Sequence, residues 1–173
     1  MNTQALETLM TRRSCRAYKP EQITDEELKA VLDAGTFAPT GRNSQSPVII
    51  AVQNRADRDE VARLNASVVN MPSDPYYGAP TVILVLAKDD DFAQLNGAAV
   101  ETNMLNAAHA AGLGSCWIHR CEQMFRTPEG KALLKKWGFD ENLVGVASLA
   151  LGYSAVPLPA PAPRKENYYT IIK

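Results

Sequence analysis

Three arginines and a serine stand together near the start of the chain, in the run Arg12-Arg13-Ser14-Cys15-Arg16. Guanidinium groups bind phosphate oxygens through two parallel N–H donors, so this run has the chemistry of a phosphate clamp. A structural interpretation competes with it, because arginines also stabilise the C-terminal end of a helix while facing water. On charge alone the structural interpretation is the stronger one, and other evidence has to decide.

A second polar group lies between Ala38 and Pro47, where the chain reads Ala-Pro-Thr-Gly-Arg-Asn-Ser-Gln-Ser-Pro. Its prolines and glycine predict a loop, and a turn-rich connection is the plain structural interpretation. The functional interpretation rests on Asn43 and Gln45. Their side-chain amides both donate and accept hydrogen bonds, which suits a heterocycle with mixed donors and acceptors.

The chain lacks the sequence motifs of nucleophilic and metal catalysis. The Gly-Leu-Gly run at 112–114 follows a predicted helix, whereas a dinucleotide fingerprint follows a strand and opens a helix. No nucleophile has a base beside it, and Cys116, His119 and Cys121 fall short of a zinc quartet. We therefore predict no catalytic side chain and no metal site. If the protein is an enzyme, a cofactor carries the reaction.

Composition limits the partners and the compartment. The 173 residues, 46% of them hydrophobic, fit a single domain with a sizeable core. A net charge of -1 gives no basic field for nucleic acid, and apolar runs such as 82–87 are too short to span a bilayer. The N-terminus has no apolar run of the signal-peptide kind, and the three cysteines favour reduced thiols, so we expect a cytoplasmic protein.

The apolar periodicity predicts the elements that position these groups. Helices are expected at 3–13, 24–35, 55–65, 91–111 and 128–137, and strands at 48–52, 81–87, 115–118 and 143–151. Thr24 and Glu27 have the spacing of a capping box, and Gly35 is expected to stop the helix that they begin. Together the helices and apolar strands predict a layered α+β or α/β domain.

Three further segments have their own expectations. Residues 91–111 lack a wide polar face, which predicts a helix buried in the core or in a subunit interface. Residues 123–127 are expected to form a short loop. Residues 157–163 hold four prolines and predict an extended arm, after which strand propensity returns over 168–172.

These motifs, in this order, resemble those of the FMN-dependent nitroreductase family. The family's opening looks like Arg-Arg-Ser-x-Arg, and its second motif looks like Ala-Pro-Ser-x-x-Asn-x-Gln-Pro, with Thr40 here in place of serine. The long helix running into Gly-Leu-Gly-Ser-Cys-Trp-Ile at 112–118 is similar to its third block. A proline-rich end that closes on Arg164 is similar to its fourth, so the resemblance covers roughly residues 9–172.

The resemblance implies a fold and an assembly. The fold is an α+β nitroreductase-like domain over residues 1–173, with a central mixed β-sheet flanked by helices. Its C-terminal arm, residues 157–173, is exchanged across a two-fold homodimer. Each active site takes one FMN, NAD(P)H is the electron donor, and hydride is exchanged at flavin N5.

The resemblance also places residues at the flavin. It puts Arg12, Ser14 and Arg16 at the phosphate and ribityl chain, with Arg13 nearby and Arg164 also at the phosphate. Pro39, Thr40 and Asn43 would reach the flavin from the other subunit, and Gln45 would lie by the ring. Trp117, Ile118 and His119 would pass along one ring face, with a backbone amide directed at N5. The His119 side chain is not expected to be catalytic, because no acid stands nearby in the sequence to orient it. Ala162 replaces a residue that is often basic in the family, and the short 123–127 segment leaves no room for the large insertion of longer members.

The expected function is NAD(P)H-driven two-electron reduction of nitroaromatics, quinones or similar small acceptors. A different flavin reaction, reductive dehalogenation or oxidative dehydrogenation, stays open. So does a non-enzymatic FMN-binding storage or sensor protein. A flavodoxin-like electron carrier fits less well, because flavodoxins have their phosphate loop after the first strand, and here the Thr40 loop precedes a strand.

Overall fold

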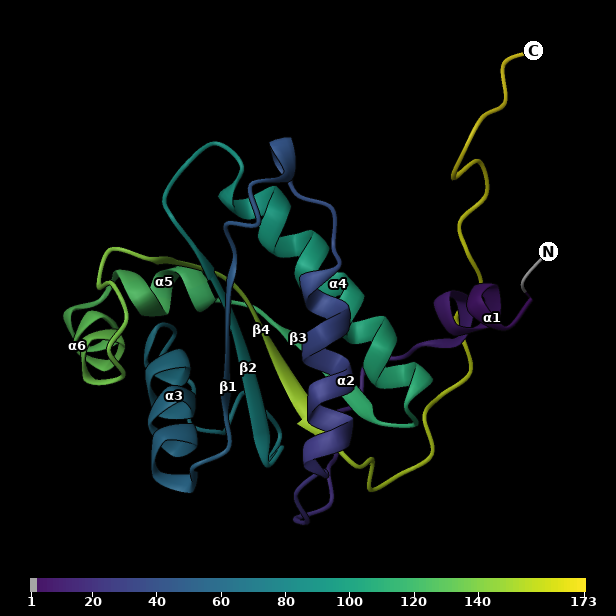
Figure 1. Cartoon of the computed structure of the whole chain (residues 1–173). Helices are drawn as coiled ribbons and strands as arrows, with labels where there is room; N and C mark the ends of the chain where they lie inside the picture. Colours follow the sequence, from purple (N-terminus) through teal and green to yellow (C-terminus); the bar gives the residue numbers. More distant parts are fainter. Residues whose placement is uncertain (1–2) are drawn as a thin grey trace.

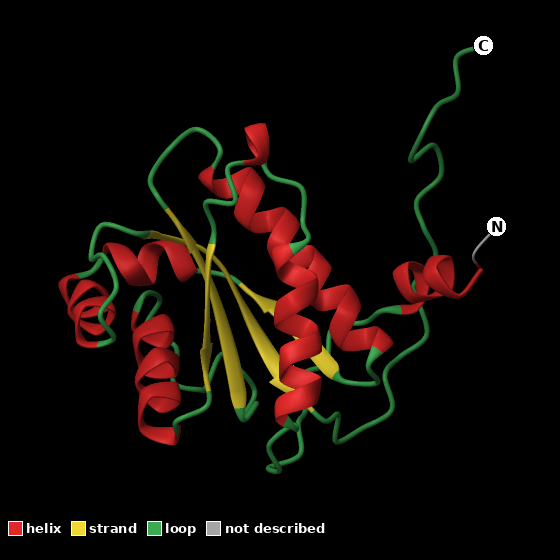
Figure 2. Ribbon diagram, viewed as in Figure 1, coloured by secondary structure: helices red, strands yellow, loops and turns green. Residues whose placement is uncertain are grey.

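The computed structural model describes residues 3–173, and in it helices cover both faces of a four-stranded sheet (Figures 1 and 2). The helices are α1 (Thr3–Thr11), α2 (Asp25–Thr36), the short 3-10 helix η1 (Gly41–Asn43), α3 (Arg55–Ser67), α4 (Ala93–Ala110), α5 (Cys121–Arg126) and α6 (Pro128–Lys136). The strands are β1 (Val48–Val52), β2 (Thr81–Ala87), β3 (Gly114–Ile118) and β4 (Val144–Gly152), in the spatial order β1-β2-β4-β3.

Neighbouring strands in this sheet are antiparallel. Val52, at the end of β1, pairs with Val82, at the start of β2, so the irregular segment after α3 returns the chain to the end of the sheet where β1 finished. The prediction of a mixed sheet is wrong for these four strands, and the parallel pairing found among the described residues is one isolated bridge, Ser14 to Ser115. The α+β layout with flanking helices is confirmed.

Two apolar layers hold the helices on the sheet. On one face α3, α5 and α6 pack against side chains such as Leu84 and Ile118. On the other face α2 and α4 pack against Ile83, Leu149 and their neighbours. Strand β2 is buried along its whole length, as a central strand with both faces covered must be.

The predicted start of α2 is confirmed, and its predicted end is wrong by one residue. The capping box is present, since the Glu27 amide donates to Thr24 Oγ1 at 3.2 Å and the Thr24 amide donates to Glu27 Oε2 at 2.8 Å. The prediction for Gly35 was wrong, because the helix continues through Thr36. A Cβ at Gly35 would lie 2.8 Å from Met104 Cγ, so the glycine lets α2 approach α4 closely.

Three segments differ from the sequence prediction. The prediction of a loop at 123–127 is wrong, because helix α5 occupies Cys121–Arg126. This helix has no side-chain cap and is held by the packing of its buried residues Met124 and Phe125. Residues 168–172 form no strand within the described chain. Helix α1 ends two residues early, at Thr11, and none of its residues is buried.

No helix within residues 3–173 has the length and apolar character needed to cross a membrane.

Candidate functional site

The fold places the arginine run beside the start of β3. Ser14 forms a parallel bridge with Ser115, and the Cys15 amide donates to the Ser115 carbonyl at 2.9 Å. The close approach needs Gly114, because a Cβ there would lie 2.8 Å from the Cys15 sulfur. The first and third sequence motifs, a hundred residues apart, therefore lie side by side along one sheet edge.

The arginines in this run divide into two kinds. Arg13 donates to the carbonyls of Arg12 and Met10 at the end of α1, so the structural interpretation holds for this side chain. Arg12 and Arg16 make no ion pair with any residue in the described part of the chain. Their positive charges are left free to bind an anion.

Two buried polar atoms in the same place also lack a partner. Ser115 Oγ and Arg13 Nε are buried and form no hydrogen bond within residues 3–173. A buried donor without a partner is costly, and a ligand with acceptor oxygens would satisfy it.

The second motif is built around η1, which Asn96 of α4 holds in place. The buried Asn96 accepts from the Gly41 amide at 2.8 Å and donates to Ser46 Oγ at 3.3 Å. Asn43 and Gln45 are exposed, and both have left-handed backbone angles, with φ of 52° and 48°. Such conformations are unfavourable for residues with a Cβ and concentrate at functional loops.

Two of the predicted flavin-contact residues also line a small cavity. Thr40 and Gln45 border a space of about 160 Å³ together with residues of α2, β1 and α4. Pro39, from the same loop, is exposed.

Within one chain, the first and second motifs do not meet. Thr11, next to the arginine run, contacts His109 near the end of α4 through a 2.8 Å hydrogen bond, whereas the η1 loop is held by Asn96 near its start. Thirteen residues of helix separate these two positions, or about 20 Å at 1.5 Å per residue. Figure 1 shows η1 and α1 at opposite ends of α4.

The end of β3 supplies the third part of the site. Trp117 and His119 are exposed, and the structure gives the His119 ring no hydrogen-bond partner among the described residues. Ile118 instead points into the core, so only its backbone is available to a ligand at this edge. Arg164 is exposed on the C-terminal tail.

Comparison with known proteins decides the family. The model of the nitroreductase family matches residues 9–76 and 66–153. The chain belongs to the nitroreductase family. A relative from Archaeoglobus fulgidus, provisionally named an NADH dehydrogenase/NAD(P)H nitroreductase, is 32% identical over 158 residues, which cover 87% of this chain and 85% of the relative.

Solved structures of the family agree with this fold. A Bacteroides fragilis nitroreductase with bound FMN has a TM-score of 0.90 and 31% identity, over 98% of both chains. A Desulfitobacterium hafniense nitroreductase with bound FMN has a TM-score of 0.89 over the whole of both chains, at 23% identity. The second similarity supports the fold alone.

The sequence did not point to several polar residues in the core of this family member. Asn65, Tyr76 and Ser148 are fully buried and hydrogen-bonded to one another. Glu101 is also fully buried, and neither of its carboxylate oxygens has a partner in residues 3–173. Burial raises the pKa of Glu101 to about 8. Ser148 is a single polar residue among apolar neighbours, and Asn65, Tyr76 and Glu101 lie in segments that hold other polar residues, so none of the four is distinguished by sequence until the packing is known.

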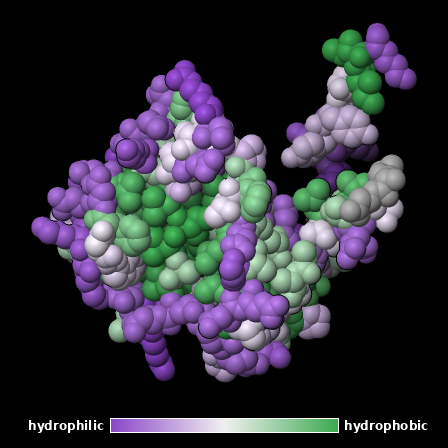
Figure 3. Space-filling view, viewed as in Figure 1, coloured by the Kyte–Doolittle hydropathy of each residue, from purple (hydrophilic) through white to green (hydrophobic). Residues whose placement is uncertain are grey.

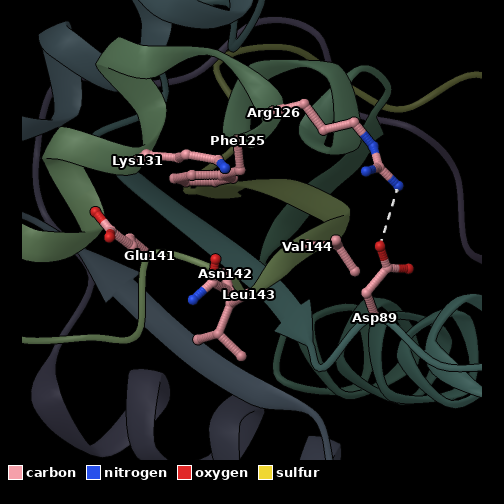
Figure 4. Close-up of a pocket in the computed structure, with 8 residues that line it drawn as sticks. All are labelled: Asp89, Phe125, Arg126, Lys131, Glu141, Asn142, Leu143 and Val144. Atoms are coloured by element: carbon pink, nitrogen blue, oxygen red, sulfur yellow. Dashed lines mark ion pairs between the residues drawn. The ribbon is translucent and has the colours of Figure 1, made fainter.

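A second cavity lies away from the predicted site residues. It has a volume of about 300 Å³ and is bounded by α5, α6, Asp89 in the segment after β2, and residues 141–144 at the start of β4 (Figure 4). Arg126 at its rim pairs with Asp89 at 3.7 Å and with Glu122 at 2.9 Å. Because the cations in its lining, Arg126 and Lys131, are balanced by the carboxylates of Asp89 and Glu141, this cavity is a poorer anion site than the Arg12–Arg16 segment.

No group of three or more His, Cys, Asp or Glu side chains within residues 3–173 is placed to hold a metal ion. Cys116 and Cys121 are buried and free, and His119 is exposed.

Proposed function

We propose that this nitroreductase-family protein binds FMN and catalyses NAD(P)H-dependent two-electron reduction of small acceptors such as quinones or nitroaromatics. The observation that carries the proposal is the unneutralised pair Arg12 and Arg16, held with Ser14 against the edge of β3. When bound, FMN would supply the redox chemistry, accepting a hydride from NAD(P)H and passing two electrons to the acceptor.

The residues of this edge fit FMN. Its phosphate is dianionic and suits Arg12, Ser14 and Arg16, while its flat ring has hydrogen-bonding edges that suit amide and backbone groups. The end of β3 lies three to four residues beyond Ser115, or about 10–13 Å further along the edge. An elongated ligand with a phosphate at one end can therefore contact both. Arg164 would add a third guanidinium if the tail folds onto the phosphate.

The position of the Asn43 loop supports an assembly of two chains. The loop lies at the far end of α4 from the arginine run, and two α4 helices packed antiparallel around a two-fold axis would bring the loop of one chain to the arginines of the other. The exposed apolar side chains fit such an interface: Leu9 and Met10 of α1 are 58% and 65% exposed, and Leu95 of α4 is 70% exposed. We therefore propose a homodimer in which Pro39, Thr40, Asn43 and Gln45 reach the partner's flavin.

The C-terminal arm belongs to the same proposal. From about residue 155 the chain runs away from the body and ends far from it (Figure 1), with Tyr169 and Ile172 almost fully exposed. The outer edge of β1 is unpaired, and apolar surface gathers around it between α2 and α3 (Figure 3). Exposed apolar arms and unpaired strand edges are both normally covered by a partner, so we propose that the arm is exchanged across the dimer.

Cofactor analysis of the purified protein tests this proposal. The protein should be yellow, or should take up FMN on titration, and should release FMN on denaturation. Reduction of the flavin on adding NADH or NADPH supports an enzyme. A bound flavin that neither nicotinamide reduces would indicate a storage or sensor protein instead.

A further inference from the structure

A buried hydrogen-bond network ends on two consecutive carbonyl groups at the end of β3. Asn65 Nδ2 donates to the His119 carbonyl at 2.9 Å and lies 3.4 Å from the Tyr76 hydroxyl. That hydroxyl donates to Ser148 Oγ at 3.1 Å, and Ser148 Oγ donates to the Ile118 carbonyl at 3.1 Å. Burial raises the pKa of Tyr76, so its hydroxyl stays a donor at any working pH. Three elements, α3, the segment before β2, and β4, thus converge on one short stretch of backbone.

Fixing a carbonyl also fixes the amide that follows it. The peptide unit is planar and trans, so the N–H points opposite to the C=O of the same unit. The Ile118 carbonyl faces Ser148 of β4, which directs the His119 N–H away from β4. The His119 carbonyl faces Asn65 of α3, which directs the Arg120 N–H away from α3. The Arg120 N–H has no acceptor among the described residues.

The backbone of Arg120 needs this support. Its φ is 78°, in the left-handed region that residues with a Cβ disfavour, and it precedes the first turn of α5. The Arg120 side chain donates through Nε to Asn65 Oδ1 at 3.1 Å. Asn65 therefore contacts the residues on both sides of the His119–Arg120 peptide. Its side-chain nitrogen donates to the carbonyl of His119, and its side-chain oxygen accepts from the side chain of Arg120.

We propose that Asn65, supported by Tyr76 and Ser148, is a positioning residue of the flavin site that aims the Arg120 N–H at the ring of the bound cofactor. The inference rests on the proposed function. It assigns to Arg120 a role in backbone geometry, because the guanidinium donates its hydrogen bond to Asn65. Hydrogen bonds from a fixed amide to the ring favour the reduced flavin, which carries more negative charge. Loss of the network lowers the two-electron midpoint potential.

The test compares FMN-loaded Asn65→Ala, Arg120→Ala and Arg120→Gly with the wild type by the flavin midpoint potential. Asn65→Ala and Arg120→Ala should each weaken reduced-flavin binding relative to oxidised by about tenfold, which is ~30 mV for a two-electron couple. For Arg120→Gly, the affinity for reduced flavin relative to oxidised flavin should stay within about threefold of wild type, because glycine adopts the left-handed conformation without support from Asn65. Gln22→Ala is the matched control. Gln22 holds the Pro80 carbonyl at 3.3 Å, well away from β3's end, so its loss should affect stability and leave the potential unchanged.

Two results would overturn the proposal. One is a wild-type potential in both Asn65→Ala and Arg120→Ala. The other is an equal shift in Arg120→Gly and Arg120→Ala, which would mean that the guanidinium itself acts on the flavin. If Asn65→Ala does not fold, Tyr76→Phe removes one hydroxyl at nearly constant volume. It should shift the potential in the same direction, with reduced-flavin binding weakened relative to oxidised by about threefold.

A second readout separates this inference from the proposed function. Backbone ¹³C chemical shifts of residues 118–120 in FMN-free protein report whether residue 120 is left-handed. Wild type and Arg120→Gly should be left-handed, and Asn65→Ala should not be. A wild-type protein that takes up no FMN contradicts the proposed function, whereas a residue 120 whose conformation ignores Asn65 contradicts the positioning role.

Discussion

At the residue scale, the arginines of residues 12–16 look alike in the sequence, and their contacts in the structure separate a structural role from a binding role. Arg13 caps α1 through backbone carbonyls, which an arginine at a helix end is expected to do. Arg12 and Arg16 have neither a carboxylate nor a carbonyl partner in the described chain, so their charges are available to a ligand.

Arg12→Ala and Arg164→Ala should therefore each weaken FMN binding by about ten- to a hundredfold, the equivalent of losing a charge-assisted hydrogen bond of roughly 1.5–3 kcal/mol. Isothermal titration of FMN into the FMN-free protein measures this. Arg42→Ala is the control, because Arg42 lies over the Phe92 ring, 5.7 Å from its centroid, and should matter less. Unchanged affinity in both test variants would refute the phosphate assignment.

Burial of Glu101 should make the stability of the protein depend on pH. Its pKa is about 8 when folded and 4.5 when free, so between these values the unfolded chain releases a proton that the folded chain keeps. The contribution is fully present below pH 4.5 and is lost as pH rises through about 8, at about 1.4 kcal/mol per unit of pKa difference.

Glu101→Gln removes this titration. Chemical denaturation at pH 4.5 and at pH 8 measures the free energy of unfolding of both proteins. Relative to wild type, the variant should be more stable at pH 8 than at pH 4.5 by several kcal/mol. A wild type and variant whose stabilities change in parallel with pH would show that Glu101 does not stay protonated in the folded protein.

At the element scale, the sequence predicted elements whose signals are local. The Thr24 capping box began α2 as expected, and the apolar runs of β1 and β2 had the predicted bounds. Helix α5 was missed because its six residues carry no side-chain cap and are held by packing. Gly35 was misread because a close contact between α2 and α4 depends on which helices meet, and no local pattern encodes that.

The same limit applies to the site. The motifs at 12–16, 38–47 and 112–118 could be found from residue types and order, and the structure brings the first and third together. Asn65 and Ser148 could not be found, because each is one polar residue whose meaning depends on contacts across three elements.

Helix α4 positions the second motif through Asn96. Asn96→Ala removes the acceptor of the Gly41 amide and should release the η1 loop, which lowers FMN affinity several-fold together with the melting temperature. Asn103→Ala is the matched control, since Asn103 on the same helix holds the Ala34 carbonyl at 3.2 Å instead. FMN titration and thermal melting of both variants measure the two effects. An Asn96→Ala protein with wild-type FMN affinity would show that the loop keeps its shape without this contact or does not touch the flavin.

At the scale of the whole molecule, the proposed dimer has each chain contribute to two different flavin sites. Leu95→Asp, on the exposed side of α4, should convert the dimer to monomer and abolish tight FMN binding at the same time, because obligate interfaces of about 2,000 Å² or more tolerate a buried charge poorly. Light scattering with FMN titration measures both properties. Val69→Asp, half-exposed just after α3, should change neither. A flavin-loaded wild-type monomer would contradict the dimer.

The most direct test of the central claim is anaerobic rapid mixing of the FMN-loaded protein with NADH and, separately, with NADPH, followed by a quinone. We expect at least one nicotinamide to remove the absorption of the oxidised flavin within a single turnover, and the quinone to restore it. A protein that binds no FMN, or whose bound FMN stays oxidised with both nicotinamides, would contradict it.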